Sequence, residues 1–317
     1  MSVLENINEK IQKSKSILIM THINPDGDAM GSTLALLSAL KKIEKKASVY
    51  MPMPNETFSF LPGFSEIITS NIDASKYDLC ISLDASDLER LGEGREYFDA
   101  IEDTIVIDHH ITNQSYGDVN YLNAVASSTC ENLIVVLAAM NIAINKEIAE
   151  SLYTGILTDT GGFRYNAQPE TYEFVAMLLE TGVETNKIYR RLFDLTTLNK
   201  TKLLARALER LELYADNKVS FTYITVKDLE ELGLEQSASE GIVNYGRNID
   251  GTEVSIFIKE QDGKYKVSMR ANEYVDVSVV ASKFAGGGHV RAAGFESVMT
   301  MEQIKVAVIE ELKKQLK

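Results

Sequence analysis

The chain has 317 residues, of which 45% are hydrophobic, enough to build two domains with cores of their own. Its formal net charge of −14 argues against non-specific binding to long duplex DNA, which requires a basic surface. No apolar stretch approaches the roughly 20 residues of a membrane-spanning helix, and the N-terminus lacks a signal-peptide pattern, so we expect a cytoplasmic protein without membrane contacts.

Up to about residue 185, short apolar runs alternate with longer amphipathic segments, which is the pattern of a parallel sheet flanked by helices. We expect strands at 16–21, 47–51, 78–83 and 104–107. Helices are expected at 4–13, 29–45, 129–140, 145–157 and 170–181. Residues 1–185 are therefore predicted to form an α/β domain.

The pattern changes in the second part of the chain. Residues 186–212 read as a helical connector, and 213–317 as a smaller α+β domain. That domain should contain β-hairpins from 218–226, 253–259 and 264–270, with a turn at 261–263. Helices at 276–284 and 301–316 frame the sequence Gly286-Gly287-Gly288-His289.

Cysteine usage points to a reducing compartment. Cys80 and Cys130 are fifty residues apart, and each lies in an apolar context. We expect both to be buried, reduced thiols, as in cytosolic proteins.

All four histidines lie in short polar motifs: His22, the pair His109-His110, and His289. His22 opens His-Ile-Asn-Pro-Asp-Gly-Asp after the first strand, which places Asp26 and Asp28 two residues apart. Asp84 follows the third strand, and Asp108-His109-His110 ends the fourth. Ligands of open α/β sheets collect at the carboxyl ends of strands, so these motifs can converge on one site. Asp159 differs, because its turn Asp-Thr-Gly-Gly follows a predicted helix.

Most of these motifs alone also fit an ordinary structural role, although two adjacent imidazoles beside a carboxylate, as in Asp108-His109-His110, have little structural use. Asp-Gly-Asp is a common turn, His22 can cap a loop, and Asp84 can cap a helix that begins near Asp87. Together, however, so many carboxylates in one pocket would repel each other unless cations lay between them. Imidazole and carboxylate ligands without sulfur favour Mn²⁺ or a related ion over Mg²⁺. Two such ions with a shared ligand can activate water and neutralise a phosphoryl group, which implies phosphoester hydrolysis.

At this point the motifs resemble a known family. The segment from His22, Asp84, Asp108-His109-His110 and Asp159-Thr-Gly-Gly look like the four motifs of the DHH phosphoesterase superfamily. Gly286-Gly287-Gly288-His289 looks like the signature of its DHHA1 domain. The chain is most similar to the nanoRNase/pAp phosphatase group. This resemblance implies hydrolysis of very short oligoribonucleotides to mononucleotides, and of 3′-phosphoadenosine 5′-phosphate (pAp) to AMP.

The resemblance also implies residue roles. One metal would be held by His22, Asp26 and Asp84, and a second by Asp28, Asp84, His109 and Asp159, with Asp84 as the bridge. Asp108 would orient an imidazole, and His110 would approach the scissile phosphate or the leaving oxygen. Substrate would be bound by Arg270, Gly286, Gly287, Gly288 and His289, and also by Arg90, for which a surface ion pair is the alternative. The second domain would clamp the far end of a short substrate.

Three other functions remain open from the sequence. The first is a phosphodiesterase for linear pApA or cyclic di-AMP, because members of the superfamily with those activities share all five motifs. The second is a family II inorganic pyrophosphatase, against which the glycine-rich segment at 286–289 argues. The third is a nucleotide-binding regulator without turnover. The chain is also compatible with a homodimer, for which the sequence assigns no surface.

Overall fold

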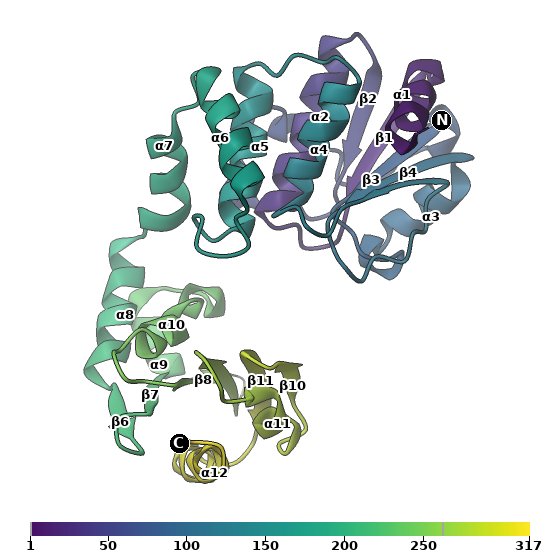
Figure 1. Cartoon of the computed structure of the whole chain (residues 1–317). Helices are drawn as coiled ribbons and strands as arrows, with labels where there is room; N and C mark the ends of the chain where they lie inside the picture. The colour runs from purple at the N-terminus through teal and green to yellow at the C-terminus, as the bar shows by residue number, and fades with distance from the viewer. Residues whose placement is uncertain (1, 262) are drawn as a thin grey trace. The chain divides into compact units, whose positions relative to one another are not determined.

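The computed structural model describes residues 2–261 and 263–317, which form two compact units, Met1–Leu195 and Thr196–Lys317 (Figure 1). Each unit contains one sheet with helices packed on it, so each is described by itself.

The first unit is built on a parallel five-stranded sheet with the order β2-β1-β3-β4-β5. Its strands are β1 (Ser16–Thr21), β2 (Lys46–Tyr50), β3 (Leu79–Leu83), β4 (Asp103–Asp108) and β5 (Val119–Leu122). Its helices are α1 (Val3–Lys13), α2 (Gly27–Lys42), α3 (Gly94–Ala100), α4 (Thr129–Ala139), α5 (Lys146–Asp159), α6 (Pro169–Glu180) and α7 (Thr185–Tyr189). The strand order changes direction between β1 and β3, where α/β sheets of this kind bind their ligands.

Apolar side chains pack against both faces of this sheet. On one face, Ile17 of β1 belongs to the same buried cluster as Leu34 of α2. On the other face, Leu18 lies in a cluster with Phe98 of α3. Neighbouring strand residues point to opposite faces, so a strand that is apolar at every position is buried on both sides. This explains the uninterrupted apolar runs of the sequence.

The second unit holds a six-stranded sheet with the order β10-β11-β9-β8-β7-β6. Its strands are β6 (Glu212–Tyr214), β7 (Val219–Ile224), β8 (Val254–Gln261), β9 (Lys264–Ala271), β10 (Gly287–His289) and β11 (Ala292–Ser297). Its helices are α8 (Leu198–Glu209), α9 (Val226–Leu232), α10 (Ile242–Arg247), α11 (Val277–Ser282) and α12 (Met301–Lys313). Two separate apolar clusters divide these helices: α11 and α12 pack on one face of the sheet, and α8, α9 and α10 on the other.

The expected α/β fold, with a smaller α+β unit after it, is confirmed. All the strands and helices predicted for the first unit are present, and both cysteines are buried and unpaired. The sequence did not reveal β5, α3, β6, α9, α10, β10 or β11.

One prediction for the second unit is wrong. Strands 218–226 and 253–259 do not form a hairpin, because β7 and β8 pair in parallel. A parallel pair needs a crossover, and the short helices α9 and α10 lie in it. β8 and β9 do form a hairpin. In its predicted turn at 261–263, residue 262 lies outside the described residues. Among the described residues, every helix is too short or too polar to span a lipid bilayer.

Candidate active site

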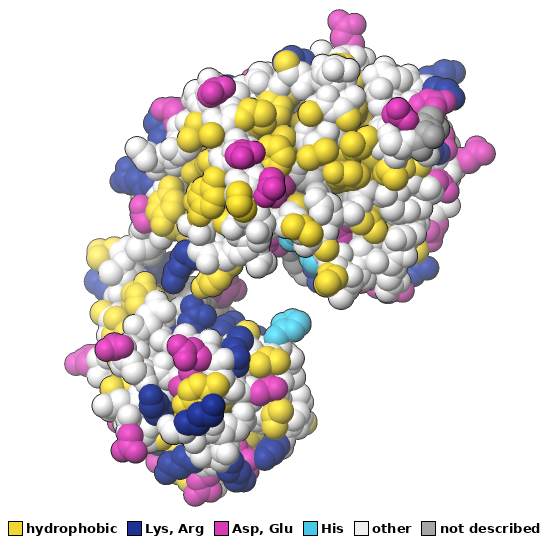
Figure 2. All heavy atoms as spheres, in the orientation of Figure 1, with side chains coloured by type: hydrophobic (Ala, Val, Ile, Leu, Met, Phe, Trp, Pro, Cys, Tyr) yellow, Lys and Arg dark blue, Asp and Glu magenta, His cyan; other side chains and the backbone are white. Residues whose placement is uncertain are grey.

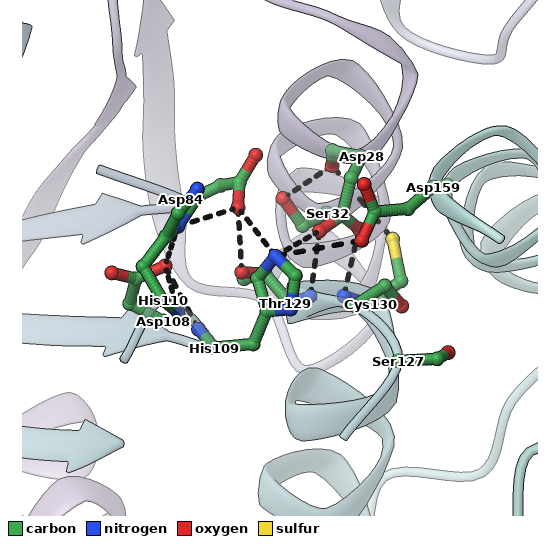
Figure 3. A network of polar contacts seen from close by, with 12 residues as sticks. Asp28, Ser32, Asp84, Asp108, His109, His110, Ser127, Thr129, Cys130 and Asp159 are labelled. Atoms are coloured by element: carbon green, nitrogen blue, oxygen red, sulfur yellow. Dashed lines mark hydrogen bonds and ion pairs between the residues drawn. The ribbon is translucent and has the colours of Figure 1, made fainter. Parts of the chain in front are cut away.

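The first four polar motifs meet at one edge of the parallel sheet. His22, Asp84 and the pair His109-His110 follow β1, β3 and β4, which are neighbours in the sheet. Asp28 lies in the first turn of α2, and Asp159 ends α5. The side chains of Asp28, Asp84, His109 and Asp159 point toward one another (Figure 3).

The ligand-type atoms are spaced as a metal site requires. His109 Nε2 lies 3.5 Å from Asp159 Oδ2, 3.7 Å from Asp84 Oδ1 and 4.0 Å from Asp28 Oδ2. His22 Nε2 lies 3.7 Å from Asp84 Oδ2. These distances exceed hydrogen-bond lengths. They match two ligands that each bind one ion at about 2.1 Å, which lie about 3–4 Å apart.

Three overlapping sets of side chains bring such atoms within 4.8 Å of one another. They are His22, Asp26 and Asp84; Asp28, His109 and Asp159; and Asp84, His109 and His110. Asp84 is common to two of these sets and lies near His109 of the remaining one. The arrangement can therefore accommodate two cations with one shared carboxylate.

A left-handed backbone conformation positions Asp84. Its φ is 57°, which is uncommon for a residue with a side chain and is typical of strained positions in functional sites. The Asp84 amide donates to the Ile107 carbonyl at 3.1 Å, which ties the turn to β4. Its Oδ1 accepts a hydrogen bond of 2.9 Å from the Thr129 hydroxyl. Both contacts fix the direction of the carboxylate.

The N-terminus of α4 holds the Asp28 carboxylate. Asp28 Oδ2 accepts from the Thr129 amide at 2.6 Å, and Oδ1 accepts from the Cys130 amide at 2.9 Å. These amides are among the groups that have no partner within a helix, and the helix dipole favours an anion there. Asp28 reaches them because α2, α4 and α5 pack closely here. A Cβ on Gly155 of α5 would lie 2.2 Å from Cys130 Sγ and 2.9 Å from Asp28 Oδ1.

Local hydrogen bonds orient the two residues that begin the site. His22 Nδ1 donates to the Ile23 carbonyl at 2.7 Å, which directs Nε2 toward Asp84. Asp26 caps α2, and its Oδ1 accepts from the amides of Asp28 and Ala29, both at 3.1 Å. The other carboxylate oxygen of Asp26 is left for a ligand. The structural role of this motif as a turn that caps α2 is therefore compatible with metal binding.

Asp108 is fully buried and binds His110 rather than joining the carboxylate cluster. Its Oδ1 lies 2.7 Å from His110 Nδ1, and its Oδ2 accepts from Asn113 at 2.6 Å. Burial alone would raise the pKa of Asp108, but the hydrogen bonds from His110 and Asn113 outweigh it and lower the pKa. The bond to Asp108 raises the pKa of His110 to about 9, although burial opposes this. The hydrogen bond to Asp108 thus makes His110 hold its proton more tightly.

The buried Asp28 and Asp84 and the half-buried Asp159 resist ionisation, because burial and neighbouring carboxylates outweigh the nearby histidines. Burial and then the charges of Asp84 and Asp159 raise the pKa of Asp28 well above its usual range. Burial and the charge of Asp26 raise the pKa of Asp84. Burial is also the main reason why the pKa of Asp159 rises to about 6. Divalent cations would remove this cost, so the donor set fits a metal centre.

Arg90 lies beside this region through its backbone. Its carbonyl accepts from the Ile23 amide at 2.8 Å, next to His22, and its own amide donates to Asp87 at 2.9 Å. The Arg90 side chain is exposed. The loop that carries Arg90 is therefore fixed to the first motif, while its guanidinium is accessible to solvent.

The glycine-rich motif of the second unit is a strand at the edge of the sheet. Gly287, Gly288 and His289 form β10, which pairs only with β11 among the described residues. Gly288 has a φ of 140°, and a Cβ there would lie 2.5 Å from the Ala292 carbonyl oxygen. A Cβ on Gly286 would lie 2.3 Å from the Gly294 carbonyl oxygen. Two of the three glycines are thus required by close packing, and His289 is exposed beside them.

The sequence did not single out three side chains that support the site. Thr129 binds both Asp28 and Asp84, Asn113 binds Asp108, and the Asn132 side chain donates to the Asp108 carbonyl at 2.9 Å. The only local signal was the run Ser127-Ser128-Thr129, which is typical of a helix start. Arg291, two residues after His289, donates to the Val275 carbonyl at 2.8 Å and so supports the backbone.

Known proteins are similar to this chain over most of its length. The Thermus thermophilus bifunctional oligoribonuclease and PAP phosphatase NrnA is 31% identical to this chain, over 93% of this chain and 90% of the relative. The Streptococcus mutans probable bifunctional oligoribonuclease and PAP phosphatase NrnA is 29% identical, over 100% of both chains. A crystal structure of an exopolyphosphatase-related protein from Bacteroides fragilis superimposes with a TM-score of 0.88 at 28% identity, covering 98% of this chain and 96% of that protein.

Family comparisons assign both parts of the chain. Residues 16–156 match the DHH family, N-terminal domain, and residues 216–317 match the DHHA1 domain. The first match contains the Asp108-His109-His110 motif and four of the residues predicted to bind metal before it, namely His22, Asp26, Asp28 and Asp84. The second contains Arg270 and the glycine-rich strand. The chain therefore belongs to the DHH family of phosphoesterases, and its second matched region is a DHHA1 domain.

Proposed function

We propose that this chain is a metal-dependent phosphoesterase that hydrolyses very short oligoribonucleotides to mononucleotides and pAp to AMP. The observation that carries the proposal is the position of Asp84, which forms one ligand set with His22 and Asp26 and lies 3.7 Å from His109 of the set with Asp28 and Asp159. The full-length relatives named as oligoribonuclease and PAP phosphatase support the choice of substrates. The catalytic domain would extend over 1–185, joined by a connector at 186–212 to a substrate-binding domain at 213–317.

Two divalent ions are part of this proposal. His22, Asp26 and Asp84 would hold one, and Asp28, Asp84, His109 and Asp159 the other. Mixed imidazole and carboxylate ligands favour Mn²⁺ over Mg²⁺, which binds almost entirely through oxygen. When bound, such ions lower the pKa of a water molecule and neutralise charge on a phosphoryl group.

The protein's own groups would position and protonate the substrate. Asp108 would hold the ring of His110 through Nδ1, which leaves Nε2 of His110 free to donate toward the scissile phosphate or the leaving oxygen. Thr129 would keep Asp28 and Asp84 in place through its amide and hydroxyl. His110 is thus proposed as the acid, and Asp108 and Thr129 as positioning residues.

In the second unit, Arg270, His289 and the backbone of Gly286, Gly287 and Gly288 would bind a phosphate of the substrate. Amides on an edge strand are available to an anion, and an arginine can hold a phosphate through two hydrogen bonds. On the first unit, Arg90 is proposed as a separate substrate contact beside the metal-binding motifs. The acidic net charge favours these few local contacts over an extended track for long duplex DNA.

Two further expectations belong to the same proposal. The buried, unpaired cysteines suit the cytoplasm. A homodimer would cover the hydrophobic side chains that gather over α4, α5 and α6 on the first unit (Figure 2), where Tyr172 and Met177 are exposed. Light scattering after size-exclusion chromatography measures that oligomeric state directly.

The decisive experiment measures initial rates with Mn²⁺ on pAp, pApA, a five-nucleotide RNA, cyclic di-AMP and pyrophosphate. We expect AMP from pAp, and mononucleotides from pApA and the short RNA. Turnover restricted to pApA or cyclic di-AMP would instead identify a signalling phosphodiesterase. Turnover of pyrophosphate alone would indicate a pyrophosphatase. Nucleotide binding without product from any of the five would leave only a regulatory role.

A further inference from the structure

One face of the second sheet carries a row of polar side chains around Arg270. In the strand register, Arg270 of β9 is opposite Ser255 of β8 and Ala292 of β11, and Ala292 is opposite His289 of β10. Ser255 is in turn paired with Ser220 of β7. Residues paired across strands point to the same face. Arg270 and His289 therefore project from one side of the sheet, two strands apart.

Helix α10 lies on this same face. A Cβ on Gly246 would be 2.4 Å from Ser220 Oγ and 2.5 Å from Ser255 Oγ, so the helix touches β7 and also β8, which is the neighbour of β9. Arg247 is the next residue and the last of α10. Its carbonyl accepts a hydrogen bond of 2.9 Å from the side chain of Asn272, which lies two residues after Arg270. The backbone of Arg247 is thereby fixed beside the end of β9.

The two arginines lack a compensating negative charge. Within the described part of the chain, no carboxylate lies within ion-pair distance of Arg247 or Arg270, whereas Arg206 and Arg210 of the same unit both bind Asp228. Arg270 Nη1 donates to the Met269 carbonyl at 3.0 Å, and the buried Nε of Arg247 has no hydrogen-bond partner there. Burial and the positive charge of Arg247 both lower the pKa of Arg270.

Two half-buried guanidinium groups on one face repel each other unless an anion joins them. The cross-strand neighbours of Arg270, Ser255 and Ala292, are small and uncharged. Arg247 shares a pocket with Asp250, Glu253 and Glu273, but none of these carboxylates is within ion-pair distance of it. A phosphate monoester carries up to two negative charges and offers three oxygens, while an internal phosphodiester carries one charge. Paired arginines therefore fit a terminal phosphate better than an internal one.

We propose that Arg247 is a second phosphate-binding arginine, which acts with Arg270 to select substrates that carry a 5′-terminal phosphate. This inference rests on the proposed function, because pAp and pApA both carry that phosphate away from the bond that is cleaved. Arg247 is thus added to the proposed contacts at Arg270 and the glycine-rich strand. Its effect on catalysis should depend on whether the substrate carries the 5′-terminal phosphate. The dinucleoside monophosphate ApA differs from pApA only by that phosphate.

The test compares kcat/KM on pApA and ApA for the wild type and for Arg247→Met. We expect the substitution to lower kcat/KM on pApA by about 10–100-fold, mainly through KM, as loss of a charged hydrogen bond would do. Activity on ApA should stay within about twofold. Arg247→Lys should restore part of the preference, because it retains the charge but not the planar group. Lys227→Met, at an exposed site on α9, is the charge-matched control and should keep the wild-type preference.

An equal loss of kcat/KM on pApA and ApA would assign Arg247 a structural role and overturn the inference. An unchanged ratio of kcat/KM on pApA to kcat/KM on ApA would overturn it as well. AMP titration into the metal-free protein provides a readout without catalysis. We expect Arg247→Met to weaken AMP binding without affecting the binding of adenosine. If the wild type hydrolyses neither dinucleotide, the proposed function fails. The AMP titration then decides alone, with wild-type affinity in Arg247→Met as the contradicting result.

Discussion

The close packing of α2, α4 and α5 makes Gly155→Ala a sharp test of how the site is built. The new Cβ would lie 2.2 Å from Cys130 Sγ, where ordinary contacts begin near 3.4 Å, so the neighbours must move by about 1 Å or more. It would also lie 2.9 Å from Asp28 Oδ1, in the carboxylate proposed to bind metal. The substitution therefore disturbs the site without removing any ligand.

The size of the effect follows from two opposing contributions. Overpacking a core costs about 1–3 kcal/mol, while replacing a helical glycine by alanine returns about 0.5–1 kcal/mol. We expect Gly155→Ala to lower the free energy of unfolding by about 0.5–2 kcal/mol, as measured by urea denaturation. Mn²⁺ affinity, measured by calorimetric titration, should fall as well, because the Asp28 carboxylate is displaced.

Cys130→Ala separates the two effects. It removes the sulfur atom but keeps the Cys130 amide that donates to Asp28. The double variant should therefore regain stability relative to the sum of the single changes, with a coupling of about 1 kcal/mol. Its Mn²⁺ affinity should stay low, because the contact with Asp28 Oδ1 remains. Wild-type stability together with wild-type Mn²⁺ affinity in Gly155→Ala would refute this account of the packing.

Three other predictions concern single side chains. Thr129→Val removes the hydroxyl that binds Asp84 and should weaken Mn²⁺ binding about 10-fold or more by calorimetry, whereas Thr129→Ser should bind normally; equal affinities would exclude the positioning role. Asp228→Asn should lower the free energy of unfolding at neutral pH by about 2–3 kcal/mol, because Arg206 and Arg210 both bind a carboxylate that is only 5% exposed. The hydrogen bond from Arg210 lowers the folded-state pKa of Asp228. This stabilisation is therefore present above the unfolded pKa of about 3.9 and is lost as the pH falls below it. Urea denaturation at several pH values should show the free energies of unfolding of the wild type and Asp228→Asn converging in acid. His289→Ala should keep the metal content of the wild type, measured by elemental analysis, and raise KM for pApA; loss of metal would contradict its assignment to substrate binding.

Much of the first unit was predictable because its strands are buried on both faces. Such strands read as continuous apolar runs, and the polar residues that end them stand out, as His22, Asp84 and Asp108 do. Because ligands gather at the carboxyl ends of strands, these residues could then be predicted to lie in one site.

The supporting contacts could not be predicted because they join distant parts of the chain. Thr129 is 101 residues from Asp28, and nothing in the local sequence relates them. The parallel pairing of β7 and β8 was hidden because α9 and α10 are only seven and six residues long, too short for clear helical periodicity. The position of Arg247 could not be predicted for the same reason, since it depends on that crossover.

The most direct test of the central claim measures AMP release from pAp and from pApA as Mn²⁺ is increased, for the wild type and for Asp84→Ala. If one metal centre cleaves both substrates, both rates should rise over the same range of Mn²⁺ concentration. Both should be lost together in Asp84→Ala, because its carboxylate belongs to both ligand sets. Retention of either activity in Asp84→Ala, or separate metal dependences for the two substrates, would contradict a single centre with a shared Asp84.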